Sequence, residues 1–315
     1  MKRFAVLGML VAGGGLSITL AAFQQPPAPA PMVIEVDKLK DNLFVLKGGG
    51  GNTAVFVTST GVVVVDTKNP GWGQPILDKI KTLTDKPVTT IVNTHTHGDH
   101  VSGNVAFPAT VDVITQENTK KYMNEPNPVF GLQTGPQTSV LKESGKGLPT
   151  RTFKDKLSVG RGADQIDLRY YGPAHTGGDA YVIFTQHRVM HVGDTFPTRA
   201  MPIMDKNNGG SGVEYSRTLA RAAGEKGVDT IINGHNPTTT TPADLRTYSE
   251  FIADFVKFVQ DAKKQGKTVD DVVSTWKTPA KYTGYTAPDP ANETAVRNAA
   301  ARVRSAAQVV WDETK

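Results

Sequence analysis

The amino-acid sequence predicts an α/β protein built as a single domain from two halves of similar rhythm. In each half, short runs of β-branched and aromatic residues predict strands, and segments with helical spacing of apolar residues follow them. Residues that can bind metal ions stand where several of these strands end. No repeat with the period of a solenoid is present, so we expect the two halves to pack together as one domain.

The first half begins with closely spaced strands. They are predicted over residues 33–36, 43–47, 54–58 and 62–66, and a further strand over residues 88–93. Four glycines at positions 48–51, followed by Asn52, separate two of these strands and predict either a loose turn or a mobile flap over a nearby site. A helix is predicted before the last strand, with Pro75 in its first turn and apolar residues at Ile76, Leu77, Ile80 and Leu83.

The remaining elements continue the same pattern. A strand over residues 111–114 and a helix over 115–123 precede a polar stretch, residues 124–150, which predicts a long loop forming part of a substrate rim. The strands of the second half are predicted over residues 166–171, 181–185, 189–192 and 228–232. Helices are expected to begin at Ser211 and at Thr241, and a last one to span residues 290–311.

The N-terminus has the pattern of a secretory signal. Lys2 and Arg3 precede an uncharged stretch that reaches residue 23, and small residues stand at Ala21 and Ala22. We expect residues 1–22 to be a signal peptide, residues 23–32 to be a Pro-rich linker, and the mature protein to be periplasmic or secreted. An uncleaved membrane anchor is the alternative, but the three glycines at positions 13–15 disfavour it.

Composition excludes several classes of function. The formal charge of +5 is modest for 315 residues, and Lys and Arg form no long block, so nucleic acid and anionic membranes are not expected partners. The chain has no cysteine, which excludes iron–sulfur clusters and zinc sites with thiolate ligands. The expected partner is a small-molecule substrate, and the sequence does not define an oligomeric state.

The sequence HTHGDH, residues 95–100, is the strongest indication of chemistry. It follows an apolar strand and places four side chains that can bind metals within six positions. His95 and His97 are two residues apart, so in extended backbone they point to the same side. Gly98 allows the chain to turn, which brings Asp99 and His100 to a second point in space. One metal could take the first pair and a second metal the latter two.

Three further candidates follow strands of the second half. His175 lies in a turn beyond residues 166–171, Asp194 follows residues 189–192, and His235 follows residues 228–232. Side chains gathered at strand ends are how α/β scaffolds build their sites. Alone, each residue fits an ordinary turn. Together with residues 95–100 they predict two adjacent metal centres with three ligands each.

With these residues in place, the sequence resembles the metallo-β-lactamase superfamily. Residues 95–100 match the family's His-x-His-x-Asp-His motif, and the resemblance extends over residues 43–236. It implies a four-layer αββα sandwich of two mixed sheets flanked by helices, with residues 33–240 as the catalytic domain and residues 241–315 as helices packed on that same domain. It also implies a full ligand set of His95, His97, Asp99, His100, His175, Asp194 and His235.

The resemblance further assigns these residues to two zinc ions. One ion would be held by His95, His97 and His175 and the other by Asp99, His100 and His235, with Asp194 bridging both. Manganese or iron are alternatives to zinc, because these nitrogen and oxygen ligands suit all three. Asp66, which ends a strand, is expected to orient a ligand, although an ordinary turn aspartate fits nearly as well. His187 and His191 match no ligand position and are expected to be structural.

The expected activity is hydrolysis. A hydroxide bridging two zinc ions would cleave an ester, lactone, thioester or amide bond, with Asp99 also serving as the catalytic residue that orients the nucleophile or carries a proton. Asp194 makes the chain similar to the glyoxalase II, lactonase and phosphodiesterase branches of the family. The alternatives are a metallo-β-lactamase acting on β-lactam antibiotics, a mononuclear iron dioxygenase acting on sulfur compounds, and a non-catalytic metal-binding protein.

Overall fold

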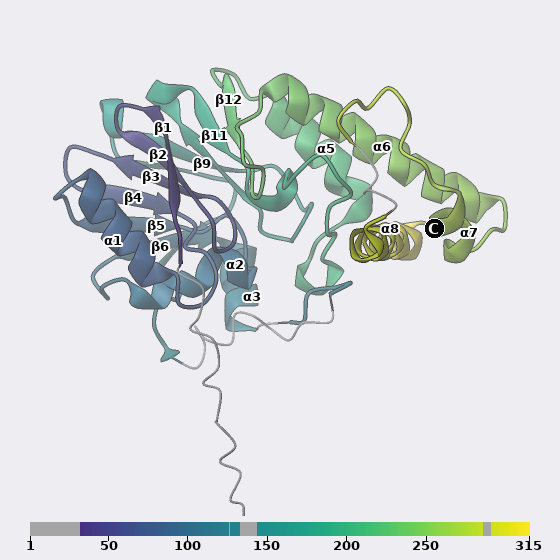
Figure 1. The fold of residues 1–315 in the computed structure, drawn as a ribbon, viewed down its shortest axis with the longest axis horizontal. Coiled ribbons are helices and arrows are strands. Elements are labelled where there is room, and N and C mark those ends of the chain that lie inside the picture. Colours follow the sequence, from purple (N-terminus) through teal and green to yellow (C-terminus); the bar gives the residue numbers. More distant parts are fainter. Residues whose placement is uncertain (1–31, 126, 133–143, 286–290) are drawn as a thin grey trace, which may run out of the picture. The chain divides into compact units, whose positions relative to one another are not determined.

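Two β-sheets pack face to face in the computed structural model, which describes residues 32–125, 127–132, 144–285 and 291–315 (Figure 1). The first sheet has seven strands in sequential order, and the second has five in the order β12-β11-β10-β9-β8. The strands of the first sheet are β1 (Glu35–Lys40), β2 (Leu43–Lys47), β3 (Thr53–Val57), β4 (Val62–Val65), β5 (Val88–Val92), β6 (Asp112–Gln116) and β7 (Arg151–Phe153). Those of the second are β8 (Lys156–Val159), β9 (Ile166–Tyr170), β10 (Ala180–Phe184), β11 (Val189–His191) and β12 (Thr230–Ile232).

Both sheets are mixed, as expected. Strands β1 to β4 pair antiparallel and β4 to β7 pair parallel, while in the second sheet only β11 and β12 pair parallel. The carboxyl ends of β4 and β5 therefore lie at one edge of the first sheet, and those of β11 and β12 at one edge of the second. These are the edges that carry the metal-binding side chains.

Helices cover the outer faces of both sheets (Figure 1). Their bounds are α1 (Gly73–Leu83), α2 (Gly98–Val101), α3 (Glu117–Asn124), α5 (Gly212–Ala223), α6 (Pro242–Lys264), α7 (Val269–Thr275) and α8 (Glu293–Glu313). Helix α1 packs on the first sheet, whereas α5, α6 and α8 share one apolar core with the second. Among the described residues, no helix is both long and apolar enough to span a bilayer.

Strand periodicity produces this layering. On β4, Val63 and Val65 point between the sheets, while Val62 and Val64 face α1. On β10, Val182 points between the sheets and Tyr181 faces the outer helices. Because these strands are buried on both faces, they consist of apolar residues throughout, which is why they could be identified in the sequence.

Several elements differ from the prediction. Strand β1 begins later than expected and carries alternating charges, as suits an edge strand with little apolar surface to bury. The strands β7 and β8 were not predicted, because they are only three and four residues long, which is too short for a clear periodic pattern. The predicted signal peptide, residues 1–22, and almost all of the predicted linker lie outside the described residues, as do residue 126 and residues 133–143 of the predicted long loop.

Candidate metal centre

The first group of candidate ligands comes from the segment that follows β5. Thr94, His95 and Thr96 form a bend after the strand, and His97 is the N-cap of the short helix α2. Asp99 and His100 lie in the first turn of that helix. The reversal that separates His97 from His100 is therefore the start of a helix that includes Gly98, and Gly98 has no positive φ angle.

The second group comes from the other sheet. His175 follows β9, Asp194 lies in the short helical turn Gly193–Thr195 after β11, and His235 follows β12. Gly234 is required beside His235, because a methyl group there would collide with the carboxylate of Asp194. The two sheets thus each bring residues from their adjacent edges to one point.

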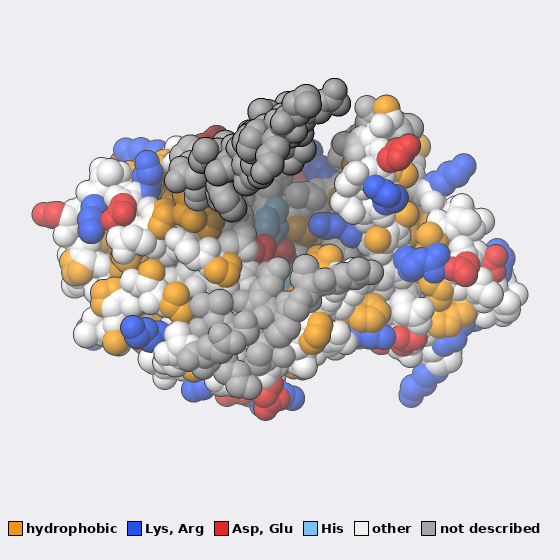
Figure 2. Space-filling model, turned by 60° about the horizontal axis from the view of Figure 1, so that its bottom comes forward, with side chains coloured by type: hydrophobic (Ala, Val, Ile, Leu, Met, Phe, Trp, Pro, Cys, Tyr) orange, Lys and Arg blue, Asp and Glu red, His pale blue; other side chains and the backbone are white. Residues whose placement is uncertain are grey.

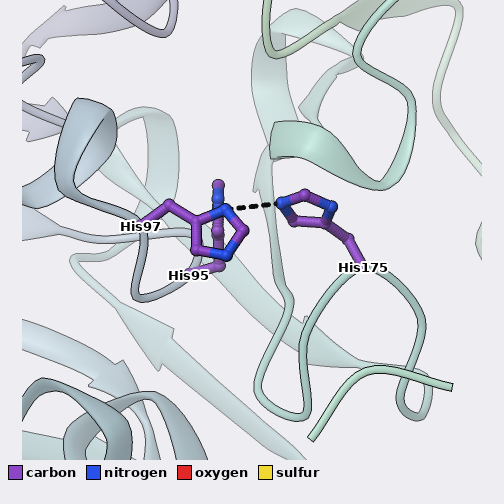
Figure 3. Close-up of side chains that lie close together, drawn as sticks. All are labelled: His95, His97 and His175. Carbon is purple, nitrogen blue, oxygen red and sulfur yellow. Dashed lines mark hydrogen bonds between the residues drawn. The ribbon is translucent and has the colours of Figure 1, made fainter. Parts of the chain in front are cut away.

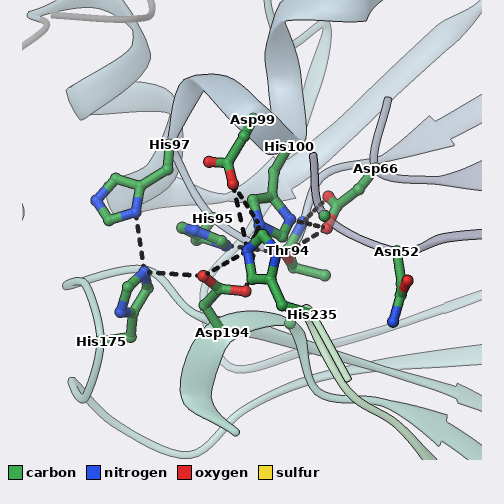
Figure 4. A network of polar contacts seen from close by, with 12 residues as sticks. Asn52, Asp66, Thr94, His95, His97, Asp99, His100, His175, Asp194 and His235 are labelled. Atoms are coloured by element: carbon green, nitrogen blue, oxygen red, sulfur yellow. Dashed lines mark hydrogen bonds and ion pairs between the residues drawn. The ribbon is translucent and has the colours of Figure 1, made fainter. Parts of the chain in front are cut away.

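All seven predicted ligands meet in one cluster. The ligand atoms of His95, His97 and His175, which we call the first triad, lie within 4.8 Å of one another (Figure 3). The same holds for Asp99, His100 and His235, which we call the second triad. Figure 4 shows Asp194 between the two. Its Oδ1 atom is 3.2 Å from His100 Nε2, and its Oδ2 atom is 3.2 Å from His235 Nε2 and 3.8 Å from His175 Nε2.

The imidazoles of the first triad are each held at the ring nitrogen that faces away from the cluster. His97 Nε2 lies 2.8 Å from Asp205 Oδ2, and the Nδ1 atom of His175 lies 2.8 Å from the carbonyl oxygen of Ile203. The Nδ1 atom of His95 lies 3.0 Å from the hydroxyl of Thr94. Such partners fix the ring and leave the opposite nitrogen free for a metal.

Asp66 holds His100 in the same way. Its Oδ2 atom lies 2.7 Å from His100 Nδ1 and accepts the hydroxyl of Thr94, while its Oδ1 atom accepts the Thr94 backbone N–H (Figure 4). Asp66 is fully buried and has a positive φ of 63°, an uncommon conformation for a residue other than glycine. Asp66 therefore contacts the ring nitrogen of His100 that faces away from the second triad.

Two buried atoms at the centre of the cluster test whether metal ions fit. His95 Nε2 and Asp194 Oδ1 are shielded from solvent and make no hydrogen bond of good geometry with a described residue, although Asp194 Oδ1 lies 3.2 Å from His100 Nε2. Leaving such groups unsatisfied costs about 1–3 kcal/mol each, so native proteins rarely do so without a reason. Both atoms face the cluster, and imidazole nitrogen and carboxylate oxygen are ligands for zinc, manganese and iron. The residues present fit bound metal ions.

The pKa values of His100 and His235 also favour cation binding in the second triad. Burial alone would lower the pKa of His100, yet the carboxylates of Asp194, Asp99 and Asp66 raise it well above its usual value. The Asp194 carboxylate also raises the pKa of His235 to about 9. In the absence of an ion, the buried carboxylates thus draw protons onto the neighbouring histidines. The second triad therefore attracts positive charge, whereas in the first triad burial lowers the pKa of His95 well below its usual value and that of His175 to about 4.

The histidines that were predicted to be structural stay outside the cluster. His191 Nε2 lies 3.0 Å from the carbonyl oxygen of Asn52, and its Nδ1 accepts the backbone N–H of Gly193. His187 packs against the edge of Phe56. His191 nevertheless supports the site indirectly, since it ties the segment that carries Asp194 to the first sheet.

The glycine-rich segment Gly48–Asn52, which we call the strap, lies beside the second triad. Gly51 donates its N–H to the carbonyl of Asp99, and a side chain at Gly51 would collide with the His100 ring. Asn52 reaches across to the second sheet, where its side-chain amide donates to the carbonyls of Asn233 and Asn236. These contacts place the segment beside the site and connect it to both sheets.

The side chain of Lys68 forms a hydrogen bond with the strap. Its ammonium group is fully buried and donates to the carbonyl oxygens of Leu46 and Gly51 at 2.9 and 2.7 Å. Burial lowers the pKa of Lys68 to about 7, against the attraction of Asp66 and Asp99. Sequence analysis missed Lys68 and Asp205. The only available indication of Asp205 was its place in the segment MPIMD, residues 201–205, beyond the helical turn of Asp194.

The cluster opens into a cleft of about 1490 Å³. Figure 2 shows histidine and acidic side chains at the bottom of this hollow. Asp99 and His235 of the second triad line the cleft, with side chains 26% and 31% exposed. Val129 and Leu132, from the described part of the predicted rim, line it as well.

Comparison with known proteins agrees with the fold. The sequence pattern of the metallo-beta-lactamase superfamily matches residues 46–248. A metallo-beta-lactamase type 2 from Elizabethkingia meningoseptica is 28% identical over 172 residues, which are 50% of this chain and 60% of that protein. The alpha subunit of a 2,4-dinitroanisole O-demethylase from Nocardioides sp. (strain JS1661) is 26% identical over 165 residues, 50% of this chain and 45% of that protein.

Solved structures show the same fold. A metallo-beta-lactamase from Pontibacter korlensis superposes with a TM-score of 0.56 at 19% identity. The superposed region covers 69% of this chain and 99% of that chain. The sec-alkylsulfatase Pisa1 from Pseudomonas sp. superposes with a TM-score of 0.69 at 14% identity. The superposed region covers 89% of this chain and 50% of that chain.

The αββα sandwich and its histidine and aspartate cluster define a protein of the metallo-beta-lactamase fold with a candidate metal centre. The chain belongs to the metallo-beta-lactamase superfamily. It spans 60% and 45% of the lengths of the two sequence relatives.

Proposed function

We propose that the protein is an exported dinuclear zinc hydrolase that cleaves an ester, lactone, thioester or amide bond. One ion would be held by the first triad and the other by the second triad, with Asp194 contributing to both. The observation that carries the proposal is Asp194 itself, whose two carboxylate oxygens approach histidines of both triads. A single-metal centre would not need this shared carboxylate together with His100 and His235.

In the proposed reaction, the metal ions and the side chains of the protein have different roles. When bound, two zinc ions supply a water of lowered pKa and positive charge for the oxygen on which negative charge develops. Asp99 faces the cleft, and its carboxylate can orient a water molecule or hold a proton destined for the leaving group. His97 and His175 are held rigidly by Asp205 and Ile203, so the substrate meets a site whose geometry is already set.

Metal content is the first test. Protein purified without added metal should contain two zinc ions per chain by elemental analysis, and His235→Ala should lower this number. His187→Ala is the matched control, because His187 lies outside the cluster and its loss should leave the metal content unchanged. A single iron per chain would contradict the proposal and favour an oxygenase acting on sulfur compounds.

Substrate class is tested with a panel of lactones, esters, thioesters and amides. Hydrolysis of at least one class, lost on chelation and restored by zinc, is the expected result. A β-lactam belongs in the panel as the second candidate, because the sequence is 28% identical to a metallo-beta-lactamase over 172 residues. Activity on β-lactams that far exceeds activity on every other class would replace our proposal with that one.

Export is proposed from residues 1–22 and is tested separately. Expression of the full chain in a bacterial host should yield a periplasmic product shortened by about that segment, as read by mass spectrometry of the intact protein. Retention of the complete N-terminus in the membrane fraction would instead favour an uncleaved anchor.

A further inference from the structure

The cleft continues from the metal cluster to a wall formed by the C-terminal helices. Helix α8 contributes Ala295, Val296, Ala299, Ala300 and Val303, which are small or apolar, together with Asn298 and Arg302. Trp276 and Tyr285 line the same part of the cleft. The volume of about 1490 Å³ exceeds the roughly 300–1,000 Å³ of usual small-molecule pockets, so the cleft has room for a substrate that extends well beyond the reacting bond.

Apolar surface is exposed inside this cleft. Leu132 and Val296 are 38% and 39% exposed, and they are two of only four large hydrophobic side chains exposed in the described part of the chain. Both line the cleft, on different segments. Exposed apolar side chains gathered in a concave surface mark a place where apolar ligand surface is buried.

Away from the metal cluster, the described charged residues that line the cleft are all basic. Apart from Asp99 and Asp194 of the cluster, the described lining contains no acidic residue, but it contains Arg199, Lys277 and Arg302. Arg199 is paired with Asp244 at 2.8 Å. Lys277 and Arg302 make no ion pair or hydrogen bond with a described residue, and Figure 2 shows Lys and Arg side chains on the wall beside the hollow. A cleft lined by charges of one sign concentrates ligands of the opposite sign.

From these features we infer that the substrate is an amphiphilic anion. Its apolar body lies against α8 and the neighbouring aromatic residues, its anionic oxygen group pairs with Lys277 and Arg302, and its hydrolysable bond lies at the metal cluster. The inference rests on the proposed hydrolase function. It adds that one substrate carries an apolar chain and a negative charge away from the bond that is cleaved.

A pair of matched esters tests the preference. One is the para-nitrophenyl ester of a straight-chain monocarboxylic acid, and the other is the para-nitrophenyl monoester of a dicarboxylic acid of equal chain length. We expect kcat/KM to be roughly threefold to tenfold higher for the anionic ester, as two half-exposed ion pairs would provide. The preference should shrink at high ionic strength, because salt screens exposed charges.

A double variant, Lys277→Met with Arg302→Met, identifies the source of the preference. In this variant the ratio of the two kcat/KM values should fall to about one. Lys267→Met is the matched control, since Lys267 is exposed outside the cleft, and its ratio should equal that of the unchanged protein. A preference that survives the double variant would overturn the inference, as would equal kcat/KM values for the two esters in the unchanged protein.

A binding measurement separates this inference from the proposed function. The dissociation constant of a long-chain alkane dicarboxylate, measured by calorimetry, should rise threefold to tenfold in the double variant and stay constant in Lys267→Met. This result is expected even if neither ester is hydrolysed, in which case the proposed reaction fails while the inferred anion-binding cleft stands. A dissociation constant that is equal in all three proteins would show that the dicarboxylate binds elsewhere, for example at the metal cluster, and would overturn the inference.

Discussion

The two triads are built from the same residue types but differ in how firmly they are held. Every member of the first triad is buried, and each of its imidazoles has a partner at the ring nitrogen that faces away from the cluster. In the second triad only His100 is fully buried and held, by Asp66. Asp99 and His235 are 26% and 31% exposed and line the cleft. The first triad is a closed, rigid set, and the second is open to the substrate.

This difference suggests a division of labour. Rigid, buried ligands lose little freedom when an ion binds, so the first ion should bind more tightly than the second. The open triad can exchange ligands during a reaction, which is what catalytic sites need and structural sites avoid. The two triads should therefore behave as a tight site and a loose one.

The largest effect is expected for His95→Ala. His95 Nε2 is an unpartnered buried atom at the junction of two ligand groups, so its loss should disturb the first triad and the shared Asp194 together. We expect hydrolysis to fall to the background rate and at least one zinc ion to be lost. Elemental analysis with kinetics on the same sample checks this. Full metal content with normal kcat would mean that His95 is not a ligand.

Asp99→Ala should have the next largest effect, and mainly on kcat. Loss of a positioned acid–base group costs about 10²–10⁴-fold in rate. The side chain is partly exposed at the start of α2, so the fold should persist, with an unchanged far-UV circular dichroism spectrum. Retained activity would contradict the role of Asp99 as orienting residue and proton carrier.

A smaller and more selective effect is expected from the orienting carboxylates. Asp205→Asn should weaken the tighter ion and Asp66→Asn the looser one, each by about 10–100-fold in affinity, because these residues hold His97 and His100 respectively. Zinc removal by a chelator, followed in a competition titration, should show two steps in the unchanged protein. If both variants shift the same step, the triads are not separate sites.

These orienting residues also show where sequence analysis reached its limit. HTHGDH could be recognised because its four side chains are contiguous and follow an apolar strand. His175, Asp194 and His235 could be found because each follows a strand closely, and the ends of these strands meet at one edge. Asp205 offers no such pattern. It reaches His97 only because the loop after Asp194 folds back across the first triad.

The cleft was equally hidden in the sequence. The Ala-rich helix at the C-terminus could be predicted from its composition, but not which of its faces borders the metal cluster. The layers of the fold were more accessible, since strands buried on both faces consist of apolar residues throughout. Local patterns thus predicted the sheets and the ligands, whereas contacts between distant segments decided how the ligands are held and what the substrate meets.

The smallest expected effect concerns the strap beside the second triad. Lys68→Met would leave the carbonyl oxygens of Leu46 and Gly51 buried without their donor, at a cost of about 1–3 kcal/mol in the free energy of unfolding. Lys81→Met, on the exposed face of α1, is the control and should change stability by less than about 0.5 kcal/mol. Denaturant unfolding measures both. Because Gly51 packs on His100, the loss of Lys68 should also loosen the second zinc ion and spare the first. Equal weakening of both ions would show that the strap supports the whole cluster and not its open half alone.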